Sequence, residues 1–220
     1  MVYGREVKGR ELHFGVSGML WRNALVMYDR ETDTLWSHYT GEAIEGELKG
    51  ERLEMLQAVP RVAWKDWIKQ HPNTKVLVVN GKAYAERSPY EGYFNDPNRT
   101  GIRPTKNQDS RLPPKSFVLG ILVDKKAVAV PLKVLEEKRV VVFDVGKDRI
   151  AAFYDPDSGA LGAVRVQADD PIVRIEGLEL VTRTGQRTHI GNARLLPAIR
   201  SYWFAWADFH PDTEVVEGSG

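Results

Sequence analysis

Two stretches of this chain share one pattern: WKDWIKQHPNTKV at residues 64–76 and WFAWADFHPDTEV at residues 203–215. In both, two tryptophans three positions apart are followed by His-Pro, then by Thr, then by Val. Tryptophans at this spacing lie on one face of a helix, and the residue before a proline is disfavoured within a helix. We therefore predict helices over residues 63–70 and 196–209, each stopped by its His-Pro step and followed by a short strand.

A weaker match precedes each copy of this pattern. Residues 26–31, Val-Met-Tyr-Asp-Arg-Glu, are similar to residues 152–157, Ala-Phe-Tyr-Asp-Pro-Asp, and a leucine follows each four residues later. We interpret the chain as an internal duplication about a pseudo-twofold axis, and the groove between two such units is a natural ligand site. The expected division is a first unit at residues 1–80, an ordered connector loop at 81–115, a second unit at 116–217, and a Gly-Ser-Gly tail at 218–220 that resembles a tag remnant.

Most apolar runs in the chain are short, rich in β-branched residues and bounded by turn residues. This composition is typical of antiparallel hairpins rather than helices. The expected fold is a β-rich α+β protein of two similar units, each a small antiparallel sheet or half-barrel with one tryptophan-bearing helix. Strands are predicted at residues 12–16, 24–28, 75–79, 117–123, 127–131, 139–145, 149–154, 163–166 and 178–182.

The composition excludes some classes of function. The 31 basic and 30 acidic side chains leave a net charge of +1, so no global field favours nucleic acid. The chain has no cysteine, which removes disulfides, thiolate nucleophiles and Cys-ligated metals. No run approaches the roughly 18 apolar residues of a membrane span, and no signal peptide is recognisable, so the chain as written is expected to be cytoplasmic. The sequence identifies no cofactor.

The connector loop carries the first candidate site. Tyrosines alternate there with Gly, Pro and Asn, and its later part is basic. Arginines could grip a phosphate or carboxylate, which predicts a small anionic ligand between the units. The other interpretation is a solvated crossing loop in which Asp109 pairs with Arg111. The predicted ligand contacts are Tyr90, Tyr93, Arg103, Arg111 and Lys115.

A second candidate site lies around the first hairpin. Asp29, Arg30, His38 and Glu42 form the densest polar set near a repeated motif, and together they would supply an acid, a base and a cation for hydrolytic or proton-transfer chemistry, with or without a divalent metal. The alternative is that Asp29 caps its own turn, as the equivalent Asp155 would. No metal-ligand set is predicted.

Several motifs together resemble the prokaryotic domain-of-unknown-function family 3179, over almost the whole chain. The resemblance implies no particular activity, cofactor or catalytic residue. The matching segments are FGVSG at residues 14–18, LVMYDRET at 25–32, LWS at 35–37, GEAIEG at 41–46, YFNDP at 93–97, DSRLPPK at 109–115 and WFAW at 203–206.

The chain departs from the family pattern in two places. The family usually has, ahead of the FGVSG motif, a segment similar to residues 116–136 and a Cys-containing stretch, which this chain lacks. The first unit is therefore expected to be a shortened form, or to receive its missing strands from a second copy in a homodimer. The second departure is His38, where the family more often has Gln. Members of the family are often exported, so the resemblance leaves localisation open.

Two functions follow as expectations. The first is a binding or scaffold-like protein with a ligand between the units, and the alternative is the hydrolytic or proton-transfer enzyme described above.

Overall fold

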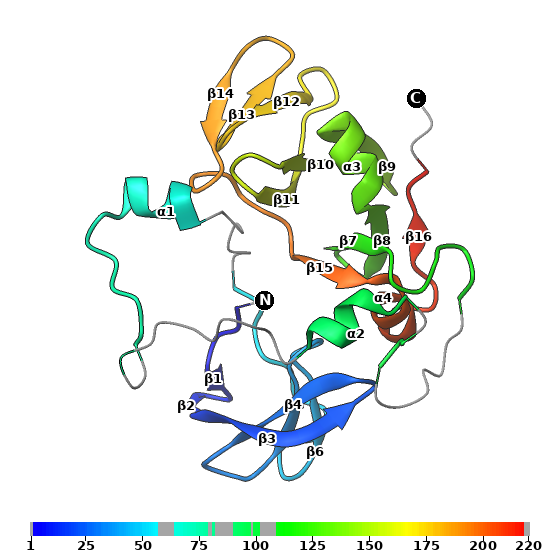
Figure 1. Cartoon of the computed structure of the whole chain (residues 1–220). Coiled ribbons are helices and arrows are strands. Elements are labelled where there is room, and N and C mark those ends of the chain that lie inside the picture. The colour runs from blue at the N-terminus through cyan, green and yellow to red at the C-terminus, as the bar shows by residue number, and fades with distance from the viewer. Residues whose placement is uncertain are drawn as a thin grey trace.

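The fold is a β-rich α+β arrangement of several small sheets and a few short helices. The computed structural model of the protein describes residues 2–56, 64–78, 81, 90–97, 99–101 and 109–217. Figure 1 shows one group of sheets in the upper part of the view and a separate sheet below it. The predicted fold class is confirmed at this level, whereas the internal duplication remains a prediction. No helix among the described residues is long and apolar enough to cross a membrane.

The lower sheet is formed by the first part of the chain. Its strands follow one another in order as β3-β4-β5-β6, and each neighbouring pair is antiparallel. Leu12 and Trp36 are fully buried in its core, with a small hairpin, β1–β2, beside it. The bounds are β1 Glu6–Val7, β2 Arg10–Glu11, β3 Phe14–Trp21, β4 Ala24–Asp29, β5 Leu35–Ser37 and β6 Ala43–Glu45.

A second sheet has the order β15-β7-β8-β16 and carries helix α4. The short strand β16 joins β8 in parallel, while the other pairs are antiparallel. Trp203 and Trp206 of α4 are buried among apolar side chains of this sheet, so the helix covers one of its faces. The bounds are β7 Phe117–Val123, β8 Lys126–Pro131, β15 Ala198–Tyr202, α4 Trp203–Phe209 and β16 Glu214–Val215.

Strand β10 of a third sheet lies between two hydrophobic cores. Side chains alternate across a strand, so Ile150 and Ala152 face the core that holds Leu135 of helix α3. Ala151 and Phe153 face the core shared with β12 and β13. Residues 150–153 are therefore apolar at every position. The bounds are α3 Leu132–Lys138, β9 Val140–Val145, β10 Asp148–Asp155, β11 Ala160–Arg165, β12 Ile172–Glu176, β13 Glu179–Thr182 and β14 Arg187–His189.

Three predictions of secondary structure were wrong. The helix predicted over residues 196–209 begins only at Trp203, because residues 198–202 pair with β7 along their whole length as β15. The strand predicted at 75–79 does not form within its described part, residues 75–78. The connector, predicted as an ordered loop, contains the short helix α2, Glu91–Asn95. The predicted first helix is confirmed as α1, Trp64–Gln70.

Candidate functional site

The Asp29 carboxylate closes the turn after β4. It accepts hydrogen bonds from the Thr32 amide at 2.6 Å, from the Thr32 hydroxyl at 2.8 Å and from the indole nitrogen of Trp36 at 2.8 Å. Asp29 is buried, so these donors take the place of water. Asp155 makes the same turn contact at the end of β10, where it accepts from the Ser158 amide at 3.2 Å and hydroxyl at 2.6 Å. These contacts are those of a turn-capping carboxylate.

Arg30 and Glu42 contact other side chains. The Arg30 guanidinium lies 5.6 Å from the centre of the Tyr28 ring, in a cation–π arrangement. Glu42 forms an ion pair with Arg52 at 2.7 Å. Neither contact brings these residues toward Asp29.

His38 lies at the opposite end of the β4–β5 pair from Asp29. Its Nδ1 is 2.9 Å from the carbonyl oxygen of Leu25, four residues before Asp29 on β4. At about 3.3 Å per residue this offset separates the two by roughly 13 Å along the strand. Within the described part of the chain, no hydrogen bond or ion pair joins any two of Asp29, Arg30, His38 and Glu42. The structure therefore does not gather these four side chains into one centre.

The ammonium group of Lys115 is held by the connector. It donates hydrogen bonds to the carbonyl oxygens of Tyr93 and of Asp96, the latter at 2.7 Å, and it lies 4.0 Å from the centre of the Tyr93 ring. Both carbonyls belong to the carboxyl end of α2, where the last carbonyls of a helix lack partners and attract a cation. Lys115 thus caps this helix. Two predicted contacts, Tyr93 and Lys115, do lie together.

Aromatic rings continue from Tyr93 onto the second sheet. The Tyr93 ring is 6.4 Å from that of Tyr202, which stacks on Phe117 at 4.4 Å. Burial raises the pKa of the Tyr93 hydroxyl, and the neighbouring Tyr202 adds to the shift. Tyr90 is exposed, and its ring centre lies 6.5 Å from that of Phe94. This surface joins the connector to the second sheet.

Arg111 is bound to three groups of the protein. Its guanidinium donates to both carboxylate oxygens of Asp109 at 2.7–3.1 Å and to the carbonyl oxygen of Thr213 at 2.8 Å, and it lies 5.2 Å from the centre of the Trp203 ring. This pairing lowers the pKa of Asp109 and raises that of Arg111. Arg111 therefore ties the connector to α4 and β16. Arg103 lies outside the described residues.

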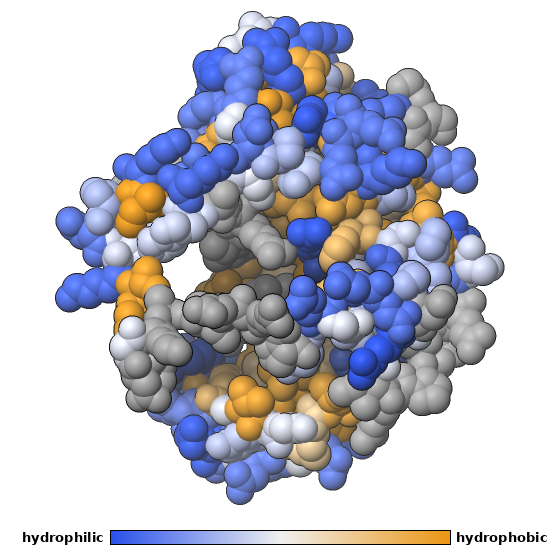
Figure 2. All heavy atoms as spheres, in the orientation of Figure 1, coloured by the Kyte–Doolittle hydropathy of each residue, from blue (hydrophilic) through white to orange (hydrophobic). Residues whose placement is uncertain are grey.

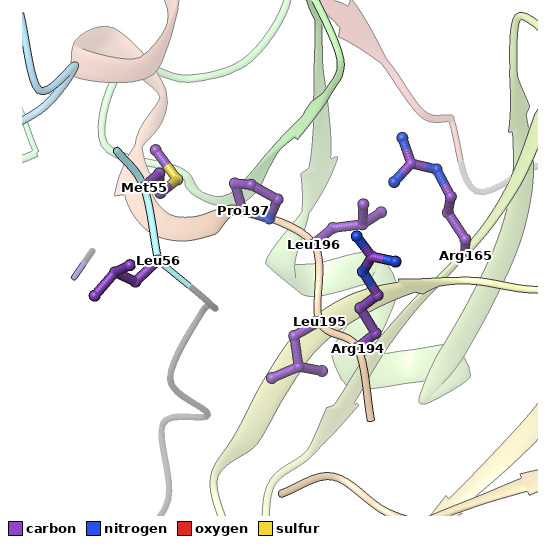
Figure 3. Close-up of a pocket in the computed structure, with 7 residues that line it drawn as sticks. All are labelled: Met55, Leu56, Arg165, Arg194, Leu195, Leu196 and Pro197. Atoms are coloured by element: carbon purple, nitrogen blue, oxygen red, sulfur yellow. The ribbon is translucent and has the colours of Figure 1, made fainter. Parts of the chain in front are cut away.

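A cavity of about 720 Å³ opens between the first and second parts of the chain. Figure 3 shows Met55 and Leu56 on one side and residues 194–197, with Arg165, on the other. Figure 2 shows the molecule hollowed in its middle, between the upper sheets and the lower one. Two other pockets, of about 390 and 10 Å³, are smaller. The volume is in the range of small-molecule sites.

The cavity wall formed by residues 194–197 is held by backbone pairing. The Leu196 amide donates to the carbonyl of Ala163 at 2.8 Å, the Leu122 amide donates to the carbonyl of Pro197 at 2.9 Å, and Leu195 forms a bridge with Val164. The segment is thereby attached to both β7 and β11. A site built on paired backbone keeps its geometry when a ligand arrives.

Two guanidinium groups lie in the cavity wall, in different electrostatic surroundings. Arg165 forms ion pairs with Asp124 at 2.9 Å and with Asp148 at 3.3 Å, so its charge is balanced. Arg194 is exposed and has no hydrogen bond or ion pair with any residue that the structure describes. A guanidinium without a described partner, beside Leu195 and Leu196, has the chemistry to bind an anion with an apolar portion.

Sequence reasoning missed this wall. Arg194 is a single arginine in a loop, and nothing in the local sequence distinguishes it from surface arginines such as Arg174. Its place becomes visible only when β15 pairs with β7 and brings residues 194–197 against Met55. The one signal available was its position directly before an apolar Leu-Leu-Pro run.

No three His, Asp or Glu side chains in the described ranges gather in a way that could hold a metal ion. The repeated histidines have another contact instead. The His71 ring lies against Trp67 and the His210 ring lies against Trp206, tilted by 36° and 43°, with ring centres 4.1 and 4.2 Å apart. Burial lowers the pKa of His210 to about 4, so its imidazole is neutral at pH 7.

Comparison with known proteins identifies the family. No curated protein matches the chain, and no solved structure matches it. One family model does, that of the protein of unknown function DUF3179, and the match extends over residues 1–213. The chain therefore belongs to the DUF3179 family.

Proposed function

We propose that this protein binds a small anionic molecule in the cavity between its two parts. The observation that carries the proposal is Arg194, an exposed guanidinium without a described partner on the wall of a cavity of about 720 Å³. An amphipathic ligand suits this lining, because its carboxylate or phosphate would meet Arg194 while its apolar portion would contact Leu196 and Met55. The role is that of a binding or scaffold-like protein.

The predicted connector contacts have a secondary place in this proposal. Arg111 and Lys115 use their charged groups on protein acceptors, so an anion would have to compete with bonds already made. Tyr90 and Tyr93 offer stacking surfaces, and the Tyr93 ring already holds the Lys115 ammonium at 4.0 Å and the Arg99 guanidinium at 5.8 Å. Arg194 is the better anchor. Tyr90, Tyr93, Arg103, Arg111 and Lys115 remain predicted contacts.

The experiment is calorimetric titration of the whole chain with octanoate, which combines a carboxylate with an apolar tail. We expect saturable binding that weakens at least tenfold in Arg194→Ala, about 1.4 kcal/mol, the magnitude of one charge-assisted hydrogen bond. The matched control is Arg174→Ala, because Arg174 pairs with Glu176 on β12 and does not line the cavity. That variant should bind octanoate as the unmodified chain does.

A neutral ligand tests whether the charge is recognised. Octan-1-ol has the same tail without the carboxylate, so it should bind the unmodified chain more weakly than octanoate does. Its affinity should be the same for the unmodified chain and for Arg194→Ala. Equal affinity for octanoate and octan-1-ol would contradict anion recognition. Absence of saturable binding for both octanoate and phenyl phosphate would contradict the proposal as a whole.

The hydrolytic or proton-transfer alternative stays a prediction that names Asp29, Arg30, His38 and Glu42. It requires these residues to act on one substrate, although each contacts a different partner in the described structure. Its test is a screen of esterase and phosphatase model substrates with the unmodified chain and His38→Ala. Turnover lost in His38→Ala, with folding retained, would revive it.

The internal duplication is also a proposal. It is supported by repeated contacts rather than by shared sheets: Asp29 with Thr32 and Asp155 with Ser158 close equivalent turns. A homodimer also remains a prediction. Sedimentation equilibrium of the purified chain tests for it, and a monomer at all concentrations would contradict it.

A further inference from the structure

The two tryptophan motifs are built alike. In the motif around α1, here called the α1 motif (residues 64–78), the Trp67 indole nitrogen donates to the Thr74 hydroxyl at 2.9 Å. In the motif around α4, here called the α4 motif (residues 203–217), Trp206 donates to the Thr213 hydroxyl at 2.9 Å. Each motif therefore folds its helix and the following segment against each other in the same way.

The histidine contacts agree as well. The amide of His71 donates to the carbonyl of Trp67 at 2.9 Å, and the amide of His210 donates to the carbonyl of Trp206 at the same distance. Each imidazole lies against its tryptophan in a similar tilted arrangement, with ring centres 4.1 and 4.2 Å apart. The α1 motif thus has the internal geometry that the α4 motif uses for docking.

The α4 motif is docked on the β7–β8 hairpin. Trp206 is 1% exposed and lies over Gly120 of β7, where an added Cβ would overlap its ring. Val215 pairs in parallel with Ala129 of β8, and the Val216 amide donates to the Ala129 carbonyl at 2.9 Å. The hairpin therefore provides a position over Gly120 for the indole, here called the glycine seat. It also provides a strand edge with which the segment after the helix pairs.

The α1 motif lacks this cover. Trp64 is 52% exposed and Trp67 is 40% exposed, and residues 76–78, Val-Leu-Val, are exposed, Leu77 at 83%. No backbone hydrogen bond joins residues 75–78 to any other described residue. Figure 1 shows α1 at the edge of the view, away from the labelled sheets, and Figure 2 shows hydrophobic side chains at the surface there. Several exposed apolar side chains on one short segment are typical of an interaction surface.

We propose that the α1 motif is a preformed docking surface for a two-stranded antiparallel β-hairpin, seated as β7–β8 is seated on the α4 motif. The first strand of this hairpin would present a glycine beneath Trp67. Its second strand would add in parallel to residues 75–78, completing their backbone hydrogen bonds. The proposed hairpin is not the chain's own β7–β8, because β7–β8 already packs against α4 and pairs with β16.

Charge distinguishes the partner of the α1 motif from β7–β8. Lys126 of β8 lies 4.0 Å from Glu214, the residue after Thr213. The residue after Thr74 is Lys75, which inverts the sign at this position. A hairpin that fits the α1 motif therefore carries an acidic residue where β8 has Lys126. If β8 itself were bound there, its Lys126 would lie beside Lys75 and the two cations would repel each other.

The test uses a synthetic peptide of residues 117–131 with Lys126→Glu and a solubilising tail. We expect it to bind the full chain, shifting tryptophan emission to shorter wavelength, and to bind at least tenfold more tightly than the peptide that keeps Lys126. Trp67→Ala in the protein should abolish binding, whereas Lys65→Ala, on the same helix, should not. A Gly120→Val peptide should fail to bind, because the glycine seat is filled.

An isolated hairpin is marginally stable, so a fusion provides a second measurement. The Lys126→Glu hairpin is joined ahead of Met1 through a Gly-Ser linker, and hydrogen exchange at residues 75–78 is compared with and without Trp67→Ala. We expect slowed exchange only with Trp67 present. Unchanged exchange in both fusions, with no peptide binding, would overturn the proposal. So would self-association of the unfused chain that Trp67→Ala abolishes, because that surface would then belong to a second copy.

Discussion

Trp206 covers Gly120 so closely that a Cβ atom on this glycine would overlap the six-membered ring of the indole. Trp203 and Trp206 of α4 are the buried tryptophans of the described helices, and this contact places Trp206 on the centre of β7. Because residue 120 has no side chain, the indole approaches the strand closely and α4 packs on the sheet. The glycine seat requires that residue 120 has no side chain. It does not require a left-handed backbone, since Gly120 is not among the residues with positive φ.

Gly120→Ala should therefore destabilise the protein although alanine is the better strand residue. Overpacking of a close contact costs about 1–3 kcal/mol. The measurement is denaturant unfolding followed by tryptophan fluorescence. The matched control is Gly92→Ala in α2, where an added Cβ meets no atom within 4 Å. Gly92→Ala should leave stability unchanged or raise it, and a Gly120→Ala variant as stable as the unmodified chain would contradict the seat.

Arg111→Ala should lower thermal stability by about 1 kcal/mol, because Asp109 and the Thr213 carbonyl lose their common donor. Arg111→Lys should recover only part of the loss, since an ammonium group cannot form the paired contact with a carboxylate. Circular dichroism melts of both variants measure the effect. Unchanged melting in Arg111→Ala would contradict a stabilising role for these contacts.

The same pair predicts a dependence on pH. The pKa of Asp109 is lowered in the folded state, so its contribution to stability is present above the unfolded value, about 3.9, and is lost as pH falls through the folded value. The stability difference between the unmodified chain and Arg111→Ala should therefore be constant near neutrality and shrink below about pH 4. Unfolding measured from pH 7 down to pH 3 tests this, and a constant difference throughout would contradict it.

The sequence predicted the hairpins well because their signals are local. Turn residues flank β9 and β10, and the strands themselves are apolar runs that contain β-branched residues. No distant contact was therefore needed to recognise them. The same holds for the helix stops at His71 and His210, which a following proline enforces.

Long-range pairing explains what local signals missed. Residues 198–202 precede two tryptophans in a pattern that suits one long helix, but pairing with β7 makes them a strand. The two copies of the tryptophan motif differ in burial although they agree in sequence, because only one has a hairpin against it. The cavity is lined by Met55 and Leu56 and by residues 194–197, more than 130 positions later, so no single window of sequence contains it.

Burial of His210 predicts a second dependence on pH. Its folded pKa, about 4, lies below the unfolded value of about 6.5, so the unfolded state binds more protons between these limits. Stability should therefore fall as pH decreases from about 6.5 to 4, by less than the ~1.4 kcal/mol per pH unit of a fully buried group. His210→Gln should flatten this slope, and an unchanged slope in that variant would assign the dependence to other groups.

Asp29→Ala should destabilise the first sheet strongly. The substitution leaves the buried indole nitrogen of Trp36 and the Thr32 amide without their acceptor, and each unsatisfied buried donor costs about 1–3 kcal/mol. We expect a loss of about 2–4 kcal/mol in denaturant unfolding. The control is Asp157→Ala, because Asp157 is exposed in the equivalent turn of β10 and β11. That variant should stay within about 0.5 kcal/mol of the unmodified chain.

The outcome at Asp29 also separates the two functional hypotheses. A carboxylate that holds its own turn together is committed to the fold, and its removal is felt as unfolding whether or not a substrate is present. If Asp29→Ala instead keeps the stability of the unmodified chain, the Trp36 and Thr32 contacts are dispensable, and the carboxylate is free to serve chemistry. The hydrolytic hypothesis would then gain the acid that it needs, and the binding role of the cavity at Arg194 would have to be tested against it.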